Sequence, residues 1–364
     1  MGIKNLSIIL NKMCKCAINQ RKLNVYSGMI IGIDLSIFLY KYLYNNDDHI
    51  EGLTRLILRL LKNGITPVFI IDGRPPKEKN EILQNRKERK IFLNTKKEII
   101  DYSIKLSKDN YDNFKDGISN YIKEINQEYV ISDDEIRDLF SKGNDELIVE
   151  SDKISKKIIY VTAAHIENAK KLFDLFGVGY IVAPSEAESL LASLCKSRFI
   201  DACISEDTDI LANGGLLFLR NFNADKNYVD EYCLEGILDN LKLNYDEFID
   251  FCILCGCDYT AKINGLGPIN ALKLIHKYKN LETIISEIKL GNKYVIPDNF
   301  DYVKARELFL NPIDIRIVEN IKNITKMREP NLNGLNDFLK DTKLKHTYLK
   351  EININLMNYY LNIV

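Results

Sequence analysis

Acidic residues follow four apolar segments of the sequence at the point where each segment ends. The first two segments run directly into Asp34 and Asp72. The other two lead through short loops into pairs of acids that lie two residues apart. These pairs are Glu186 with Glu188 and Asp207 with Asp209. Because ligands of open α/β sheets bind beyond the carboxyl ends of the strands, we expect these carboxylates to meet at one sheet edge.

Carboxylates crowded in this way predict a site for divalent cations. Neighbouring carboxylates raise each other's pKa unless a cation neutralises them. No matching set of basic residues follows these four segments. Mg²⁺ and Mn²⁺ prefer carboxylate and water oxygens as ligands. A single Asp after a strand is more often a turn residue or a helix N-cap, but four such strands in one chain favour a metal site.

The two acids of each pair have different geometric relations. Asp207 and Asp209 face the same way if their segment is extended. The residues Pro184 and Ser185 indicate that a helix begins near Glu186. On a helix, Glu186 and Glu188 would lie about 200° apart around the axis. We therefore expect one of these two glutamates to act mainly through water.

The segments that position these acids predict a mostly parallel central sheet flanked by helices. Continuous apolar runs are typical of strands that are covered on both faces. Helical periodicity lies between them, in Glu51–Asn63 before Gly64 and in His165–Phe176 before Gly177. Strands that alternate with helices indicate a parallel α/β fold. The five predicted strands are Met29–Ile33, Pro67–Ile71, Val178–Ala183, Ala202–Ser205 and Leu216–Arg220.

The strand pattern is interrupted between about residues 77 and 158, where polar, helix-favouring sequence replaces it. Residues 74–97 hold nine Lys or Arg and three Asp or Glu, whereas residues 98–158 hold nine and fifteen. We interpret this region as an insertion between two halves of one sheet domain, with a basic front and an acidic back. The acidic part either lengthens the insertion or forms a disordered loop. After about residue 235 the pattern is mostly helical.

Composition excludes some broad classes of protein. The chain has 364 residues, with 50 Lys+Arg against 51 Asp+Glu, so it is no uniformly basic, histone-like protein. A local basic surface for nucleic acid remains compatible with this balance. No run reaches the roughly 18 consecutive apolar residues of a membrane helix, and the first residues lack an apolar signal-peptide core. We expect the eight cysteines to be reduced thiols in a protein that is not secreted.

Several different short motifs follow one another along the chain. They are Met1-Gly2-Ile3, Ile33-Asp34-Leu35-Ser36, Ile71-Asp72-Gly73-Arg74-Pro75-Pro76, Ala183–Glu188, Ser205–Asp209, Cys255–Tyr259 and Gly265-Leu266-Gly267-Pro268. As an ordered set over about residues 1–310, they resemble the flap endonuclease branch of the structure-specific 5′ nucleases, the XPG and Rad-type enzymes. The resemblance adds Asp258, which follows no predicted strand, as a seventh acid.

The resemblance implies a PIN/resolvase-like nuclease core with an inserted helical arch and a C-terminal helix-turn-helix region. It implies two Mg²⁺ ions, with Mn²⁺ able to substitute, and hydrolysis of DNA phosphodiesters at 5′ flaps or single-strand/duplex junctions. Such a nuclease serves DNA replication, repair or recombination. The metal ligands that the resemblance implies are Asp34, Asp72, Glu186, Glu188, Asp207, Asp209 and Asp258.

Two basic residues of the insertion are candidate catalytic cations. Lys79 and Arg86 lie seven residues apart and share a face if their segment is one helix. By resemblance they match the arch-base lysine and arginine that contact the scissile phosphate, where they would offset developing charge. The alternative is a solvated charged face. General DNA contact and a solvated face both remain open for Lys87, Arg89, Lys90, Lys96 and Lys97.

The resemblance also implies DNA-binding residues outside this group. Tyr40 lies in the helix predicted after Asp34, where the family has an aromatic residue that stacks on a base. The alternative for Tyr40 is a core tyrosine. Gly2 and Lys273 are further DNA-binding candidates by resemblance.

Gly265 and Gly267 predict a glycine hairpin before an apolar helix over Ala271–Tyr278. Such a hairpin lets backbone N–H groups approach a DNA phosphate. By resemblance it grips duplex DNA through a monovalent cation, for which we expect K⁺. Lys262 stands where the family often has a serine that helps to bind this cation. Either backbone carbonyls suffice, or Lys262 replaces the ion and binds phosphate itself.

The C-terminal segment Leu332–Leu339 resembles a sliding-clamp-binding tail, with Leu332 in place of the usual Gln. The alternative is a tail that packs on its own domain.

We predict five regions along the chain. They are residues 1–76 and 159–234 for the two parts of the nuclease core, 77–158 for the arch with its acidic extension, 235–330 for the helical DNA-binding region and 331–364 for the tail.

These features predict branched or flapped DNA as the partner, a sliding clamp as a further candidate partner, and no membrane. We expect a monomer inside the cell, in the nucleus or at a cytoplasmic site of replication. Alternatives are a 5′ exonuclease or a Holliday-junction resolvase of the same family, an RNA-cleaving nuclease, and a non-catalytic protein that binds branched DNA.

Overall fold

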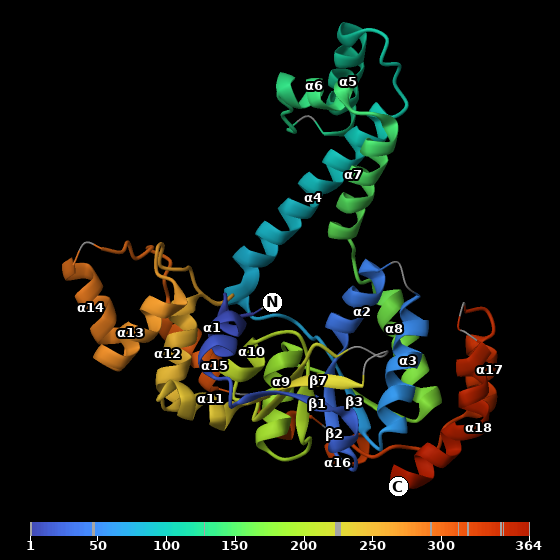
Figure 1. Cartoon of the computed structure of the whole chain (residues 1–364), viewed down its shortest axis with the longest axis vertical. Helices are drawn as coiled ribbons and strands as arrows, with labels where there is room; N and C mark the ends of the chain where they lie inside the picture. The colour runs from blue at the N-terminus through green and yellow to red at the C-terminus, as the bar shows by residue number, and fades with distance from the viewer. Residues whose placement is uncertain are drawn as a thin grey trace. The chain divides into compact units, whose positions relative to one another are not determined.

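The computed structural model describes residues 2–45, 48–126, 128–222, 227–291, 293–311, 313–318, 320–342, 344 and 346–363. The chain divides into two compact units (Figure 1). One unit, here the sheet unit, consists of Met1–Leu39, Asp48–Lys79 and Thr162–Val364. The other, here the helical unit, consists of Tyr40–Asp47 and Asn80–Val161.

The sheet unit is built on a seven-stranded sheet with the strand order β1-β7-β6-β5-β2-β3-β4. The five strands from β6 to β4 are parallel, and β7 runs antiparallel to both β6 and β1. The predicted mostly parallel sheet is therefore confirmed. The five predicted strands are β2 (Ile30–Asp34), β3 (Thr66–Ile71), β4 (Gly179–Val182), β5 (Ala202–Ile204) and β6 (Leu217–Arg220).

Two strands at one edge of the sheet were not predicted. They are β1 (Ile18–Lys22) and β7 (Tyr228–Cys233), which pair with Ile18 opposite Tyr232. Antiparallel strands at an edge need only one apolar face, so their sequences carry no continuous apolar run. Because Asn19 to Lys22 are polar, β1 has no apolar run from which a strand could be predicted.

The helices that cover the sheet begin and end at residues of the expected kinds. α3 (His49–Lys62) begins after Asp48, whose side chain accepts a hydrogen bond from the Ile50 N–H at 2.9 Å. α8 (Ala163–Phe176) ends at Gly177, which has φ +73°. A β-carbon at Gly177 would lie 2.1 Å from the Arg328 carbonyl oxygen, so both the backbone and the packing require glycine there.

Further helices complete the chain, and the apolar core runs without a break from the sheet into α12 and α13. Three short 3₁₀ turns are η1 (Leu23–Tyr26), η2 (Lys77–Lys79) and η3 (Ile315–Ile317). The helices outside the helical unit's own bundle are α1 (Leu6–Met13), α2 (Leu35–Tyr44), α9 (Ala187–Lys196), α10 (Asp209–Ala212), α11 (Leu234–Leu241), α12 (Tyr245–Cys255), α13 (Pro268–Tyr278), α14 (Leu281–Gly291), α15 (Tyr302–Leu310), α16 (Ile321–Ile324), α17 (Leu332–Leu339) and α18 (His346–Ile363).

The helical unit has an apolar core of its own. Its main helices are α4 (Asn80–Ser103), α5 (Tyr111–Ile125), α6 (Asp133–Ser141) and α7 (Asn144–Lys157). α4 and α7 lie side by side, and α5 and α6 gather at one end of this pair (Figure 1). The acidic stretch is thus a folded extension, and the disordered-loop alternative is wrong. The core residues are Ile99, Ile100, Phe114, Ile118, Ile122, Ile136, Leu139, Leu147 and Ile154.

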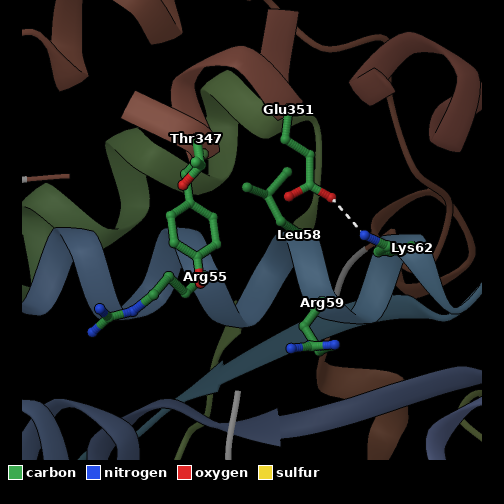
Figure 2. Close-up of a pocket in the computed structure, with 7 residues that line it drawn as sticks. Arg55, Leu58, Arg59, Lys62, Thr347 and Glu351 are labelled. Carbon is green, nitrogen blue, oxygen red and sulfur yellow. Dashed lines mark hydrogen bonds and ion pairs between the residues drawn. The ribbon is translucent and has the colours of Figure 1, made fainter. Parts of the chain in front are cut away.

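The C-terminal segment packs on its own unit. α17 lies against α8, with Leu335 and Leu339 fully buried. α18 lies against α3, and a cavity of about 320 Å³ opens between these two helices (Figure 2). An ion pair of 3.3 Å between Lys62 Nζ and Glu351 Oε1 borders this cavity. The alternative of a tail that packs on its own domain is therefore observed, while binding to a sliding clamp stays a prediction.

None of the helices in the described part of the chain combines the length and the apolar character that crossing a membrane requires.

Candidate active site

Four adjacent parallel strands, β5, β2, β3 and β4, deliver the predicted acids to one edge of the sheet. β2 ends at Asp34, and Asp72 directly follows β3. Hydrogen bonds tie these strand ends to the neighbouring loops. Asp34 Oδ2 accepts from Ser205 Oγ at 3.0 Å, and Asp72 Oδ1 accepts from the Ala187 N–H at 2.9 Å. The strand topology thus brings together the six acids that the sequence pattern had grouped.

Two serines that the sequence analysis did not single out hold the carboxylates in place. Ser205 Oγ donates to Asp34 and accepts from the Asp207 N–H at 3.0 Å, so one buried hydroxyl links β2 to the loop after β5. Ser36 Oγ donates to Asp72 Oδ2 at 2.5 Å. Both serines lie inside the motifs that carried the family resemblance, two residues before or after an acid, which was the only sequence signal for them.

The structure does not meet the condition under which Asp207 and Asp209 would face the same way as in a strand. The segment is not extended, because Thr208 is helical (φ −74°, ψ −8°) and Asp209 is the first residue of α10. The N–H groups of a first helical turn have no partner within the helix. The Asp209 N–H finds one in Asp207 Oδ1, at 3.0 Å. A tight turn, rather than strand alternation, therefore brings the two carboxylates together.

Glu186 and Glu188 have different surroundings. Glu186 is the N-cap residue of α9, whereas Glu188 lies in the first turn of that helix. Glu186 bonds to Lys79 and to the Tyr259 hydroxyl. Glu188 instead lies in the field of the carboxylates at the strand ends. The two glutamates therefore differ, as expected, and action of one of them through water stays a prediction.

Gly2 lies directly against two of the acids. Its φ is +78°, and a β-carbon there would lie 2.0 Å from Asp207 Oδ1 and 2.7 Å from Asp209 Oδ1. Only glycine fits this position. The Lys4 N–H donates to the Gly256 carbonyl at 2.9 Å, which holds the N-terminal segment beside the loop that carries Asp258. DNA contact by Gly2 stays a prediction.

Lys79 and Asp258 complete the acidic group. Lys79 is only 6% exposed, its Nζ forms a hydrogen-bonded ion pair with Glu186 Oε1, and the same Nζ lies 3.7 Å from Asp258 Oδ2. Burial alone would lower the pKa of Lys79, but attraction from Glu186, Glu188 and Asp209 outweighs burial and raises it. Asp258 follows the helix α12 and not a strand, so the argument from strand ends could not find it.

The acids repel one another strongly in this structure. Burial is the main cause that raises the pKa of the Asp34 carboxyl, and repulsion from Asp72 is the second cause. For Glu188, burial again raises the pKa most, and repulsion from Asp34 is the second cause. For Asp209, burial raises the pKa most, and repulsion from Asp207 is the second cause. The site therefore holds more negative charge than its own residues neutralise.

This surplus of charge fits divalent cations. Asp209 Oδ1 is buried and has no hydrogen-bond partner in the described part of the chain. All seven acids offer carboxylate oxygens, the ligand type that Mg²⁺ and Mn²⁺ prefer. Across the described ranges, no three Asp, Glu, His or Cys side chains are arranged to hold an ion as they stand. The chemistry of the donors thus fits the ions, while a complete coordination shell would require side chains to adjust.

The structure does not meet the condition on which Lys79 and Arg86 would share one helix face, namely a single α-helix through both residues. Lys79 ends the 3₁₀ turn η2, and α4 begins one residue later at Asn80. The two-turn spacing assumed a continuous α-helix, so it does not apply. Lys79 belongs to the sheet unit, whereas Arg86 is exposed on α4 in the helical unit. The catalytic role of both residues stays a prediction.

Three of the other basic residues of α4 have partners inside the helical unit. Lys90 donates to the Ile159 carbonyl at 2.8 Å, Lys96 Nζ lies 3.5 Å from Glu150 Oε1, and Lys97 pairs with Asp101 at 2.5 Å. Lys87 and Arg89 are exposed. DNA contact by these residues stays open.

Tyr40 is not a core residue. Its side chain is 42% exposed, and Lys90 Nζ lies 5.5 Å from the centroid of its ring. The core-tyrosine alternative is therefore wrong. Stacking of Tyr40 on a base stays a prediction.

The glycine hairpin precedes a helix as expected. Gly265 has φ +77°, Gly267 is the N-cap residue of α13, and Pro268 is the first helical residue. Lys273 is exposed on α13. The side chain of Lys262 runs along Gly256, since a β-carbon there would lie 3.1 Å from Lys262 Cδ. Binding of DNA and of K⁺ at the hairpin stays a prediction.

Comparisons with known proteins agree with this architecture. The XPG N-terminal domain matches residues 1–91, and the XPG I-region matches residues 177–258. The chain is 34% identical over 357 residues to flap endonuclease 1 of Drosophila yakuba, covering 93% of this chain and 80% of that protein. It is 33% identical over 325 residues to flap endonuclease 1 of Enterocytozoon bieneusi, covering 85% of this chain and 77% of that protein.

A solved structure shares the fold. The catalytic core of Rad2 in complex with DNA substrate aligns with a TM-score of 0.69 and 24% identity, over 98% of this chain and 100% of that one. This likeness bears on the fold, and the sequence relatives bear on the family. The chain belongs to the flap endonuclease branch of the XPG nuclease family.

Proposed function

We propose that this protein is a metal-dependent, structure-specific 5′ nuclease that hydrolyses DNA phosphodiesters at 5′ flaps or single-strand/duplex junctions. The observation that carries the proposal is the convergence of seven acids with a surplus of buried negative charge, in a chain of the flap endonuclease family. The relatives' names, and the DNA substrate bound to the Rad2 core, support DNA as the substrate.

Asp34, Glu188 and Asp209 are each buried among like charges at this edge of the sheet. We propose that two divalent ions would bind there and that the seven acids would supply their carboxylate ligands.

The ions, when bound, would supply an activated water and stabilise the attacking and leaving oxygens of an in-line displacement. The residues of the chain would do the rest. The Lys79 ammonium is buried at the acidic edge, where it would offset negative charge on the scissile phosphate. Arg86 would add a bidentate phosphate contact, since a guanidinium presents two parallel donors. Tyr40 would stack on a base, and Gly2, Gly265, Gly267 and Lys273 would contact DNA, with K⁺ at the hairpin.

A 5′-labelled double-flap DNA in Mg²⁺ tests the proposal. Wild type should incise near the junction, whereas Asp209→Asn should lose at least about 100-fold in rate. Asp174→Asn, which alters an exposed acid paired with Arg328 on the surface, is the matched control and should incise like wild type. EDTA should abolish incision, and Mn²⁺ should restore it.

Several outcomes would count against the proposal. Equal incision by wild type and Asp209→Asn would mean that the site is wrongly assigned or that a contaminating nuclease is present. If wild type binds branched DNA tightly but cuts no flap, Holliday junction or RNA flap, the protein is a non-catalytic binder. Flaps with a blocked 5′ end, Holliday junctions and RNA flaps distinguish the flap activity from the exonuclease, resolvase and RNA-cleaving alternatives.

A further inference from the structure

Tyr259 makes contacts to two residues of the acidic site. It follows Asp258 directly and is 6% exposed. Its hydroxyl donates to Glu186 Oε2 at 2.7 Å. The face of its ring lies under Lys79, with Nζ 5.3 Å from the ring centroid. Phe309 of α15 packs edge-on against it, with ring centroids 5.0 Å apart, and so holds the ring in place.

These contacts divide the two oxygens of Glu186 between two partners. Lys79 donates to Oε1, and Tyr259 donates to Oε2. A carboxylate held at both oxygens cannot rotate about its terminal bond without losing a hydrogen bond. The lysine side chain is long and flexible, so a fixed aromatic face beneath its ammonium restricts where the charge can lie.

We propose that Tyr259 is a positioning residue of the nuclease site: its hydroxyl sets the orientation of Glu186, and its ring sets the place of the Lys79 ammonium. The proposal rests on the proposed function, in which Glu186 would hold a divalent ion and Lys79 would meet the phosphate. Tyr259 itself touches neither reacting group. It acts through the carboxylate and the ammonium that it holds.

A second group in the sheet unit supplies a matched control. Tyr26 is 1% exposed, and its hydroxyl donates to Glu231 Oε2 at 2.8 Å. Arg21 Nε lies 3.4 Å from the other oxygen of the same carboxylate. Tyr26 ends the turn η1, Arg21 lies on β1 and Glu231 lies on β7. In this group, as in the group of Tyr259, Glu186 and Lys79, a tyrosine hydroxyl and a cation hold the two oxygens of one carboxylate. Removing the Tyr26 hydroxyl therefore shows what the loss of a buried tyrosine–carboxylate hydrogen bond does when that bond lies outside the nuclease site.

The first measurement compares Tyr259→Phe with Tyr26→Phe in single-turnover cleavage of a saturating flap DNA. Tyr259→Phe should be about 10-fold slower than wild type, the lower end of the usual cost of losing a supporting contact to a metal ligand. Its Kd for the flap DNA should change less than about two-fold. Tyr26→Phe should cleave like wild type. Equal rates for the two variants would overturn the role of the hydroxyl.

The second measurement isolates the ring. When Lys79 is retained, the Tyr259→Leu variant should cleave more slowly than the Tyr259→Phe variant, because leucine removes the aromatic face as well as the hydroxyl. In a Lys79→Met background the two variants should cleave equally, since no ammonium remains to be placed. A purely structural effect of the ring would persist in that background and would overturn this part of the proposal.

The third measurement does not depend on cleavage. Calcium binding to the DNA-free protein, followed by calorimetry, should be weakened several-fold by Tyr259→Phe and unchanged by Tyr26→Phe. If wild type cleaves no branched DNA, the proposed function fails, and the calcium measurement still decides whether Tyr259 positions the ion site. If wild type cleaves and Tyr259→Phe matches Tyr26→Phe in both rate and calcium affinity, the inference about Tyr259 fails alone.

Discussion

Two groups in the sheet unit are built from the same three kinds of side chain. Lys79, Glu186 and Tyr259 form one at the acidic edge of the parallel strands, and the hydroxyl-to-carboxylate distance is 2.7 Å. Arg21, Glu231 and Tyr26 form the other at the antiparallel edge, where this distance is 2.8 Å. The hydroxyl-to-carboxylate hydrogen bonds of the two groups are nearly the same, whereas Lys79 also lies over the ring of its tyrosine.

The two groups differ in what surrounds them. At the antiparallel edge, the Glu231 carboxylate pairs with the half-exposed Arg21 guanidinium. At the parallel edge, the Lys79 ammonium faces Glu186, Glu188, Asp209 and Asp258. A hydrogen-bonded ion pair is therefore no mark of a functional site by itself. The uncompensated carboxylates around the ion pair indicate a functional site, because burying unpaired charges costs free energy and such clusters are typical of functional sites.

The largest difference between the two groups should appear when the cation of each is removed. Lys79→Met should slow single-turnover cleavage by about 100-fold, the usual cost of losing one group that stabilises developing charge. Its calcium affinity should rise, because a competing positive charge leaves the acids. Arg21→Met should leave cleavage unchanged and cost less than about 1 kcal/mol in the free energy of unfolding, as for other exposed ion pairs. Cleavage rates that fall equally in both variants would remove the distinction between the two groups.

A smaller effect should come from relieving the crowding of the acids. In EDTA, Asp209→Asn should unfold at a higher temperature than wild type, by about 2 °C or more, because a buried charge that repels its neighbours is lost. In calcium, wild type should regain stability that the variant cannot, so the difference should shrink or reverse. Differential scanning calorimetry under both conditions measures this. A lower melting temperature for the variant in EDTA would contradict the surplus of charge.

The smallest effect tests whether crowding of like charge matters away from the acids. His49 and His165 have ring centroids 4.7 Å apart, and His49 is half-buried. Burial, followed by repulsion from His165, lowers the pKa of His49 below its ordinary value. Below about pH 6.5 the unfolded chain then binds more protons than the folded one, so stability falls as the pH falls.

Melting temperatures at pH 7.5 and 5.5 check this pair. Wild type should lose about 1 °C between the two values, and His49→Gln should lose less. Each protein at pH 7.5 is its own control for any effect of the substitution on packing. The same loss in both proteins would show that the histidine pair carries no pH dependence.

Much of the nuclease core could be predicted from the sequence. The five parallel strands are continuous apolar runs, and each of four runs is followed by acids, so the strand pattern and the candidate site came from the same residues. The antiparallel strands β1 and β7 could not be predicted in this way, because neither has a continuous apolar run: β1 ends in three exposed polar residues, and in β7 only two of six residues are buried. Asp258 was accessible only through resemblance, since it follows a helix.

Other features depended on contacts between distant parts of the chain. The turn from Asp207 to Asp209 follows from the start of α10, and the ion pair of Lys79 joins it to Glu186, 107 residues further along the chain. Tyr259 had no periodicity or charge to mark it. Its role depends on Glu186, which is brought near by the fold.

The sequence by itself determined which strands are buried and which acids follow them, because apolar periodicity and the residue types at strand ends are local properties. Only the tertiary structure decided which carboxylates repel one another, which ammonium lies among them and which hydroxyls hold them. Coulomb and hydrogen-bond energies depend on distance in space, and packing, not sequence separation, sets these distances.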